Sequence, residues 1–203
     1  MKLFRIATLM LMSVLTASAL ASESADAVMA KAADRFKKSA SITADYTASA
    51  NGDVISGKIV IAGEKFALTS ASLSTWFDGT TQWTLDSRTN EVNVTEPTEE
   101  ELQQVNPFAI ISSFRKSFKP MLLKAPKGQY KVDLKPLDKK ADIRHAVVTF
   151  NSSTYLPVEI QMTTPNGQLL IKVKNASTGG NQPVTVFRFN KSKYPKVKVV
   201  DLR

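Results

Sequence analysis

Cysteine is absent from the 203 residues, and histidine occurs once, at position 145. Without cysteine the chain has no disulfide and cannot itself carry a lipid-modified cysteine. A single histidine and no thiolate exclude a metal site built from several such ligands. We therefore expect no metal and no cofactor.

The sequence also lacks the short motifs of common catalytic sites. It has no G-x-S-x-G elbow, no P-loop and no G-x-G-x-x-G turn. His145 is expected at a strand end, and Asp138 and Asp142 lie among lysines and Arg144 as in a solvated loop. These absences favour a binding protein over an enzyme.

No apolar run is long enough for a stable transmembrane helix. The longest, Ile6–Leu15, follows the basic residues Lys2 and Arg5 and precedes the small-x-small sequence Ala19-Leu20-Ala21. This order predicts a signal peptide over residues 1–21, with an uncleaved anchor as the alternative. We expect the mature protein to be soluble in the periplasm.

The remaining residues, 22–203, are sufficient for one domain with a substantial core, and they contain no internal repeat or low-complexity tract. The formal charge of +9 falls to +7 without Lys2 and Arg5. Ten Lys or Arg residues against three Asp lie between Arg115 and Arg144. Because an exported chain rarely meets nucleic acid, we expect an anionic membrane surface, an acidic partner, or solvent alone to face these charges.

Residues 57–94 contain short runs in which bulky apolar residues occupy every second position, as in β-strands. Asp78-Gly79 is a strong hairpin signal between two of these runs. Alternation predicts one broad apolar surface, with polar residues on the opposite face. Its expected members are Ile59, Ile61, Phe66, Leu68, Trp83, Leu85, Val92 and Val94.

Three helical regions are expected. Residues 24–38 can be capped by Ser24, and Thr98 with Glu101 forms a capping box for a second helical region. Asn106-Pro107 begins a further helix, whose apolar stripe is Phe108, Ile111, Phe114, Phe118, Met121 and Leu122. This stripe is either ordinary core or a lid over the sheet. A lid over an empty cavity would be loosely packed at Phe114.

Further strands are expected at 42–50 and, beyond Pro126, at 130–134, 145–150, 156–163, 168–174, 184–189 and 196–200. Asn166-Gly167 marks a hairpin turn that brings Ile160 and Met162 beside the next strand. The predicted fold class is α+β. A single curved antiparallel sheet of about ten or more strands forms an incomplete barrel, and helices cover its concave apolar face.

The pattern resembles the LolA-type family of periplasmic outer-membrane lipoprotein carriers. The matching features are Gly57–Ile61, Phe66, Asp78-Gly79 with Trp83, Val92–Val94 and Asn106-Pro107, and a tail from Phe187 that runs through Tyr194-Pro195. The resemblance implies a monomer that takes acylated lipoproteins from an inner-membrane ABC exporter to an outer-membrane receptor, with its first helix across the mouth of the half-barrel. Together with the alternation and the helical stripe, it predicts an acyl-chain cavity lined by Ile59, Ile61, Phe66, Leu68, Trp83, Leu85, Val92, Val94, Phe108, Ile111, Phe114, Phe118, Met121, Leu122, Ile160 and Met162.

One segment departs from that family. Its members commonly place an arginine after the G-x-[LIV] strand to hold the lid, but the matching residues here are Ile61-Ala62-Gly63-Glu64. A carrier of other lipids, and a lipid- or lipoprotein-sensing regulator with the same fold, therefore stay open as alternatives.

Overall fold

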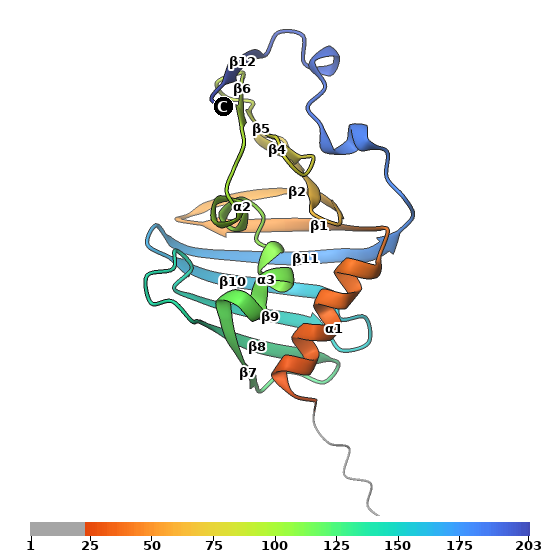
Figure 1. Cartoon of the computed structure of the whole chain (residues 1–203), viewed down its shortest axis with the longest axis vertical. Helices are drawn as coiled ribbons and strands as arrows, with labels where there is room; N and C mark the ends of the chain where they lie inside the picture. The colour runs from red at the N-terminus through yellow and green to blue at the C-terminus, as the bar shows by residue number, and fades with distance from the viewer. Residues whose placement is uncertain (1–22) are drawn as a thin grey trace, which may run out of the picture.

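The chain folds into one open sheet of twelve strands, with its helices gathered on the concave side (Figure 1). The structure is a computed structural model that describes residues 23–203. The strand order is β12-β6-β5-β4-β3-β2-β1-β11-β10-β9-β8-β7. The predicted single curved sheet of ten or more strands is thus confirmed. The predicted signal peptide lies outside the described residues.

The first half of the sheet is a six-stranded antiparallel meander. The strands are β1 (Ser41–Ala50), β2 (Asp53–Ala62), β3 (Lys65–Ser70), β4 (Leu73–Phe77), β5 (Gln82–Asp86) and β6 (Glu91–Thr95). Asn51 and Gly52 both have positive φ, at 52° and 89°, as a tight hairpin turn requires. At the next strong turn, Asp78 accepts hydrogen bonds from the backbone N–H groups of Thr80 and Thr81.

The second half is a five-stranded antiparallel meander that joins the first in the middle of the sheet. Its strands are β7 (Phe118–Leu123), β8 (Gln129–Pro136), β9 (His145–Asn151), β10 (Pro157–Thr164) and β11 (Gly167–Gly179). Strand β11 pairs with β1 from Ser41 opposite Gly179 to Ala50 opposite Leu169. Strands β6 and β7 consequently lie near opposite edges, and the segment between them must cross a face of the sheet.

That crossing segment contains α2 (Glu99–Val105) and α3 (Ala109–Ser117), which lie on the concave side (Figure 1). The predicted capping box is confirmed, because the Thr98 side chain accepts from the Glu101 N–H and the Glu101 carboxylate accepts from the Thr98 N–H. The topology therefore explains why this segment crosses the sheet, and the packing of Phe108, Ile111 and Phe114 places it on the concave face.

Helix α1 (Ala25–Lys38) runs diagonally across the same face (Figure 1). The Ser24 hydroxyl caps it by accepting from the Ala27 N–H, as predicted. Val28, Met29 and Ala32 are fully buried against the sheet. No helix in residues 23–203 combines the length and hydrophobicity that a bilayer crossing needs.

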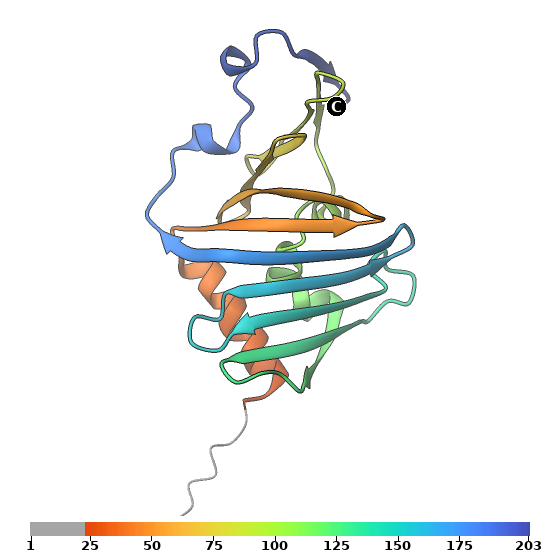
Figure 2. The same cartoon turned by 180° about the vertical axis from the view of Figure 1, so that it is seen from behind.

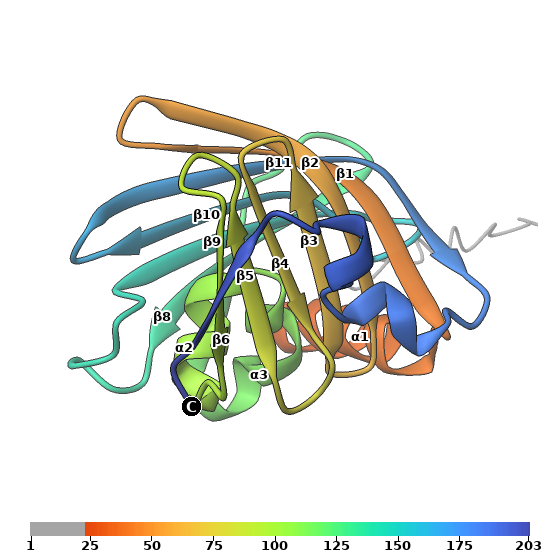
Figure 3. The ribbon, with the colours of Figure 1, turned by 90° about the horizontal axis from the view of Figure 1, so that it is seen from above.

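The sheet curves most sharply between β2 and β3, so that β3–β6 extend over the helices (Figure 3). Gly57 lies at this bend, opposite Ser70 of β3. A Cβ at Gly57 would lie 2.0 Å from the backbone oxygen of Thr69 and 3.0 Å from the Tyr46 hydroxyl. Only a residue without a side chain permits so close an approach.

The C-terminal segment leaves β11 and passes along the outer face of β3–β6 (Figures 1 and 2). The strand predicted at 184–189 is wrong: Val184–Phe187 forms a 3₁₀ turn. Both long edges of β11 are already paired, so residues 184–187 cannot pair with it, and Phe187 is instead buried on the outer surface. The last strand, β12 (Lys198–Asp201), pairs in parallel with β6, which makes the sheet mostly rather than purely antiparallel.

Candidate functional site

The concave face is lined by apolar side chains that alternate along the strands of both meanders. Ile59 and Ile61 of β2 face Leu68 and Phe66 of β3. Their counterparts on β8–β11 are Val132, Leu134, Ala146, Val148, Phe150, Ile160, Met162, Ile171 and Val173. Nearly all of these side chains are buried, and together they form one contiguous apolar wall.

The helices supply the other half of this apolar cluster. Phe108, Ile111 and Phe114 lie in it together with the buried stripe of α1. Phe114 is only 2% exposed, so the closed form is packed at this position and not loosely filled as the lid hypothesis predicted. The face is therefore covered in this state, and an apolar guest could enter it only by displacing helical side chains.

Four predicted members of the cavity lie on the opposite face of the sheet: Trp83, Leu85, Val92 and Val94. Phe66 pairs with Phe77, and Phe77 pairs with Gln82, so Gln82 is the residue that faces inward. Alternation then places Trp83 and Leu85 outward, and pairing with β6 places Val92 and Val94 beside them. The predicted single surface is wrong here because strand β4 was not identified, and its register decides which way β5 faces.

Three of these outward residues, Trp83, Leu85 and Val92, lie in or against a second apolar cluster that the C-terminal segment covers. Trp76, Leu85 and Val92 pack there with Phe187 and Val197, and Trp83 packs against them. Phe189 and Tyr194 approach the Trp76 ring at centroid distances of 5.8 and 6.0 Å. This cluster fastens the tail to the sheet and is separate from the concave face.

The predicted helix from Asn106 is too long. Helix α3 ends at Ser117, and Phe118, Met121 and Leu122 belong to strand β7. Pro120 explains the change, because proline disfavours a helical conformation in the residue before it and is tolerated on an edge strand. Phe118 and Leu122 still reach the concave cluster, but Met121 faces outward and is 47% exposed.

Several residues of the apolar wall were not among the predicted cavity residues, although the alternation of apolar residues along the sequence indicates some of them. Val148 and Phe150 alternate within the strand predicted at 145–150, and both are fully buried in the concave cluster. Phe77 contacts Phe66 at a ring-centroid distance of 5.5 Å. Period-two alternation within the strand predicted at 145–150 would have found Val148 and Phe150, whereas Phe77 lies in β4, which was not predicted.

Polar side chains interrupt the apolar wall at one place, on the inner face of β4 and β5. We call Thr75, Gln82 and Thr84 the inner polar cluster. The Gln82 amide nitrogen donates to the Thr84 hydroxyl at 3.3 Å, and that hydroxyl lies 3.4 Å from the Thr75 hydroxyl. Gln82 is 8% exposed, and its Oε1 atom has no hydrogen-bond partner in the described part of the chain.

A second polar group fastens α1 to the sheet. We call Glu23, Lys31, Tyr130 and Tyr155 the tyrosine cluster. The Tyr155 hydroxyl donates to Glu23 Oε2 at 2.9 Å and accepts from Lys31 Nζ at 3.2 Å. Lys31 also forms an ion pair with Glu23 and lies over the Tyr155 ring, which stacks on Tyr130.

Charge pairing dominates the electrostatics of the tyrosine cluster. Hydrogen bonding from Lys31 lowers the pKa of Glu23, with a further contribution from Tyr155. The carboxylate in turn raises the pKa of Lys31 and of Tyr130. No sequence pattern pointed to this cluster, because Glu23 and Tyr155 are 132 residues apart along the chain.

The segment where the related family carries its arginine is a plain hairpin turn here. Residues 61–64 join β2 to β3, and Gly63 has a φ of 61°. Among the described polar contacts, those that connect α1 to the sheet come from the tyrosine cluster, at the other side of the molecule. The helix is therefore held by different residues from those that the resemblance implied.

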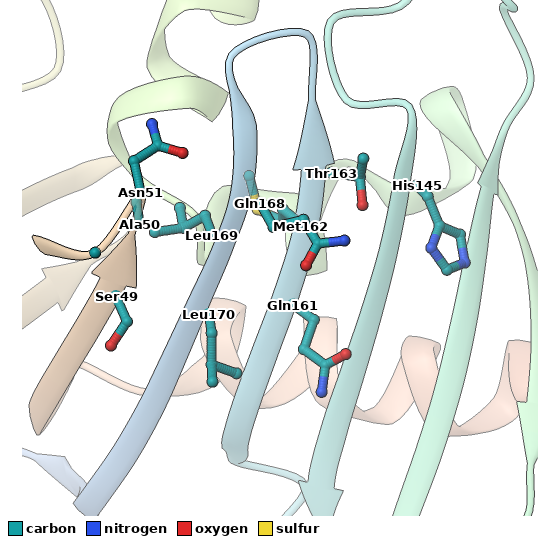
Figure 4. A pocket seen from close by; sticks show the side chains of 11 residues that line it. Ser49, Ala50, Asn51, His145, Gln161, Met162, Thr163, Gln168, Leu169 and Leu170 are labelled. Atoms are coloured by element: carbon teal, nitrogen blue, oxygen red, sulfur yellow. The ribbon is translucent and has the colours of Figure 1, made fainter. Parts of the chain in front are cut away.

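A hollow of about 530 Å³ lies on the outer face, over β1, β9, β10 and β11. Figure 4 shows α1 on the far side of the strands from it. Its side chains include Ser49, Gln161, Thr163 and His145, and His145 Nε2 contacts the buried Asp133 carboxylate. Such a polar lining does not suit acyl chains. Within residues 23–203 no group of three or more histidine or acidic residues could hold a metal ion.

The structure is therefore an open half-barrel whose apolar inner wall is covered by helices. The chain belongs to the outer membrane lipoprotein carrier protein LolA family, whose profile matches residues 15–168. That family takes its name from a carrier of outer membrane lipoproteins. The predicted family is thus confirmed.

Several solved structures are similar to this one at low sequence identity. An uncharacterized conserved protein from Thermus thermophilus is 9% identical, with a TM-score of 0.58 over 87% of this chain and 98% of that one. A LolA superfamily protein from Nitrosomonas europaea is 11% identical (TM-score 0.42, 82% and 98% covered). The MucA/MucB complex of Pseudomonas aeruginosa gives 13% identity (TM-score 0.47, 87% and 63% covered). No curated protein sequence matches the chain.

Proposed function

We propose that this protein is a periplasmic carrier that holds the acyl chains of lipoproteins between its sheet and its helices. The observation that carries the proposal is the continuous apolar wall of the concave face, which side-chain packing and the tyrosine cluster close in the described part of the chain. Each buried CH₂ of an acyl chain contributes about 0.8 kcal/mol. A lipoprotein can therefore cross water only if such a wall covers its chains.

The closed form suggests how binding stays reversible. Acyl chains would take the places of Val28, Met29, Ile111 and Phe114, which already fill the wall. The acyl chain gains the contacts with the wall that the helical side chains lose. The net binding free energy is therefore the difference between two packing energies of similar size. A carrier must deliver its cargo as well as accept it, and this balance supports both steps.

The remaining parts of the proposal follow from the family. Residues 1–21 direct export, and residues 22–203 form the carrier domain, which acts as a monomer. An inner-membrane ABC exporter supplies the acylated lipoprotein and an outer-membrane receptor accepts it. The carrier needs no cofactor and catalyses no reaction, and it has no nucleic-acid partner.

Native mass spectrometry of the protein purified from the periplasm tests the cargo. Co-purified acylated polypeptides are the expected result. Free phospholipid alone would indicate a carrier of other lipids, and a stoichiometric unacylated protein would indicate a regulatory role. Protein without any bound mass, from cells that make lipoproteins, would contradict the proposal.

Hydrogen exchange tests the displacement of the helices. On adding a synthetic diacylated lipopeptide, amides of α1 (Ala25–Lys38) and α3 (Ala109–Ser117) are expected to exchange faster, while those of β8–β11 are protected. The same peptide without acyl chains is the control. Protection of the helices together with the strands would show that the cargo does not displace them.

A further inference from the structure

The inner polar cluster is a break in an otherwise apolar wall. Phe66, Phe77 and Gln82 lie side by side on neighbouring strands, so the wall changes from aromatic to polar over one strand spacing. Thr75 and Gln82 are both buried, and Thr84 is half-buried between them. Strand pairing places them on the same face as Phe66 and Phe77, and α2 and α3 lie on that concave side of the sheet (Figure 3).

Within this cluster the hydrogen bonds are incomplete. The Gln82 amide nitrogen donates to Thr84, but its Oε1 atom is buried without a partner in the described residues. Turning the amide over would exchange the two atoms and leave the nitrogen unpartnered instead. Buried polar atoms are almost always paired because an unmade hydrogen bond is costly, so a buried acceptor that the fold leaves free points to a ligand.

The surroundings of Oε1 restrict what that ligand can be. Gln82 and both threonines are uncharged, so the cluster offers no counter-charge to an ammonium or a phosphate group. A neutral hydrogen-bond donor remains, and the adjoining Phe66 and Phe77 rings would contact hydrocarbon. Among acylated molecules this combination occurs where a chain is attached through an amide, because the N–H lies directly beside the first methylenes.

We infer that the inner polar cluster binds the amide N–H of an N-acylated cargo, with Gln82 Oε1 as acceptor and the acyl chain along Phe66 and Phe77. Thr84 positions the amide by accepting from its nitrogen, and Thr75 supports Thr84. An ester-linked chain has no hydrogen to donate and leaves Oε1 unpartnered. The inference rests on the proposed function and adds a preference for amide-linked over ester-linked chains.

A matched pair of ligands tests this preference. One is a short peptide carrying a palmitoyl group on its N-terminal amide nitrogen, and the other is its isostere in which oxygen replaces that N–H. Competition against a fluorescent fatty acid gives both dissociation constants. Wild-type protein is expected to bind the amide about three- to tenfold more tightly, the usual contribution of one neutral hydrogen bond.

Two variants locate the effect. Gln82→Met keeps the size and removes the acceptor, and it is expected to bind both ligands equally while unfolding at the same or a higher temperature. Gln161→Met, on the exposed outer face, is the control and keeps the wild-type preference. If Gln82→Met does not fold, Thr84→Val replaces it, because loss of the positioning hydroxyl also reduces the preference.

Equal affinity of wild-type protein for the two ligands would overturn the inference, and so would an undiminished preference in Gln82→Met. In either case the carrier proposal survives, since acyl ligands bind. Failure of wild-type protein to bind either ligand or the fluorescent fatty acid would overturn the carrier proposal and this inference together.

Discussion

At Gly57 the backbone of the sheet leaves no room for a side chain. The position of a Cβ there would clash with the Thr69 carbonyl, a backbone atom that cannot rotate away. Gly57→Ala is therefore expected to destabilise the protein by about 2–3 kcal/mol, as overpacked core positions do. Urea unfolding followed by circular dichroism measures the change.

The matched control is Gly180→Ala, because nothing lies within 4 Å of a Cβ at Gly180 and its φ is not in the left-handed region. Its free energy of unfolding is expected to change by less than about 0.5 kcal/mol. Equal effects of the two substitutions would show that β2 can move away from β3 at the bend.

Trp83 reports on the C-terminal segment and not on cargo, because it faces outward. In a Trp76→Phe background, a diacylated lipopeptide is expected to leave the emission of Trp83 unchanged. Phe187, at 1% exposure, is the centre of the cluster against which Trp83 packs. Phe187→Ala should therefore shift the emission to longer wavelength and cost about 3–5 kcal/mol.

The opposite result, a response of Trp83 to lipopeptide at saturation with no effect of Phe187→Ala, would place the cargo on the outer face. Ile171→Ala is a useful control, since it removes buried volume from the concave cluster without touching the tail. It is expected to destabilise the protein without altering Trp83 emission in the folded state.

Residue by residue, alternation predicted which side chains of a strand share a face but not which face is the inner one. Ile59, Ile61, Phe66 and Leu68 were correctly grouped because β2 and β3 are joined by a short hairpin. Trp83 and Leu85 alternate just as regularly and face outward. The face of β5 depends on its register with β4, which the sequence pattern did not identify as a strand.

Among the secondary-structure elements, α1 is held to the sheet by the polar contacts of the tyrosine cluster. Tyr155→Phe removes the hydroxyl that bonds both Glu23 and Lys31. Because hydrogen bonds to charged groups contribute about 1.5–3 kcal/mol, we expect exchange of the α1 amides to accelerate by about tenfold. Tyr194→Phe, in the C-terminal segment, is the control and should leave α1 unchanged.

The same cluster gives this effect a pH dependence. The pKa of Glu23 is lowered in the folded protein, so its stabilisation is present above the unfolded value of 4.5 and is lost as pH falls through the lower folded value. The pKa of Lys31 is raised, so its contribution is present below 10.5 and is lost as pH rises through the higher folded value. Hydrogen exchange of the α1 amides, corrected for the intrinsic exchange rate at each pH, measures the opening of α1. This opening should increase at low and at high pH in wild-type protein but not in Glu23→Gln. Parallel profiles for the two proteins would exclude this cluster as the cause.

Helix ends were predicted well where a capping group marks them and poorly where the apolar spacing continues. Ser24 and Thr98 fixed the starts of α1 and α2 through side-chain caps. The end of α3 was missed because Phe118, Met121 and Leu122 prolong the helical spacing into β7. There the conformational restriction by Pro120 outweighs the apolar pattern.

For the whole molecule, the excess of basic residues between positions 115 and 144 predicts contact with anionic surfaces. Lys119 and Lys135 are exposed and paired across β7 and β8, near the exposed apolar side chains of Met121 and Leu123. Binding to phosphatidylglycerol vesicles is expected at low salt and should weaken steeply as the ionic strength rises. Vesicle co-sedimentation measures it.

The matched variants reverse two charges each. Lys119→Glu/Lys135→Glu should abolish sedimentation with vesicles, whereas Lys58→Glu/Lys172→Glu, which changes two exposed lysines elsewhere on the outer face, should reduce it only slightly. Similar losses in both would mean that net charge alone causes binding. Binding that does not depend on salt would assign the contact to Met121 and Leu123 instead.

The overall architecture was predictable because the number of alternating strands and the two helical stretches admit few arrangements besides a covered, curled sheet. The order of strands across that sheet was not. Pairing of β1 with β11, and the parallel pairing of β12 with β6, join segments more than 100 residues apart. No local pattern encodes such partners.

This central pairing sets the order in which the newly made chain can fold. β1 follows the first helix directly, yet its neighbour β11 ends at residue 179 of 203. Until that residue has left the ribosome, and has crossed any membrane through which the chain is exported, the first meander keeps an unpaired edge and an uncovered apolar face. Loop closure over such distances slows folding. The nascent chain therefore keeps this apolar face uncovered for most of its synthesis, and the complete sheet forms only after β11 has been made.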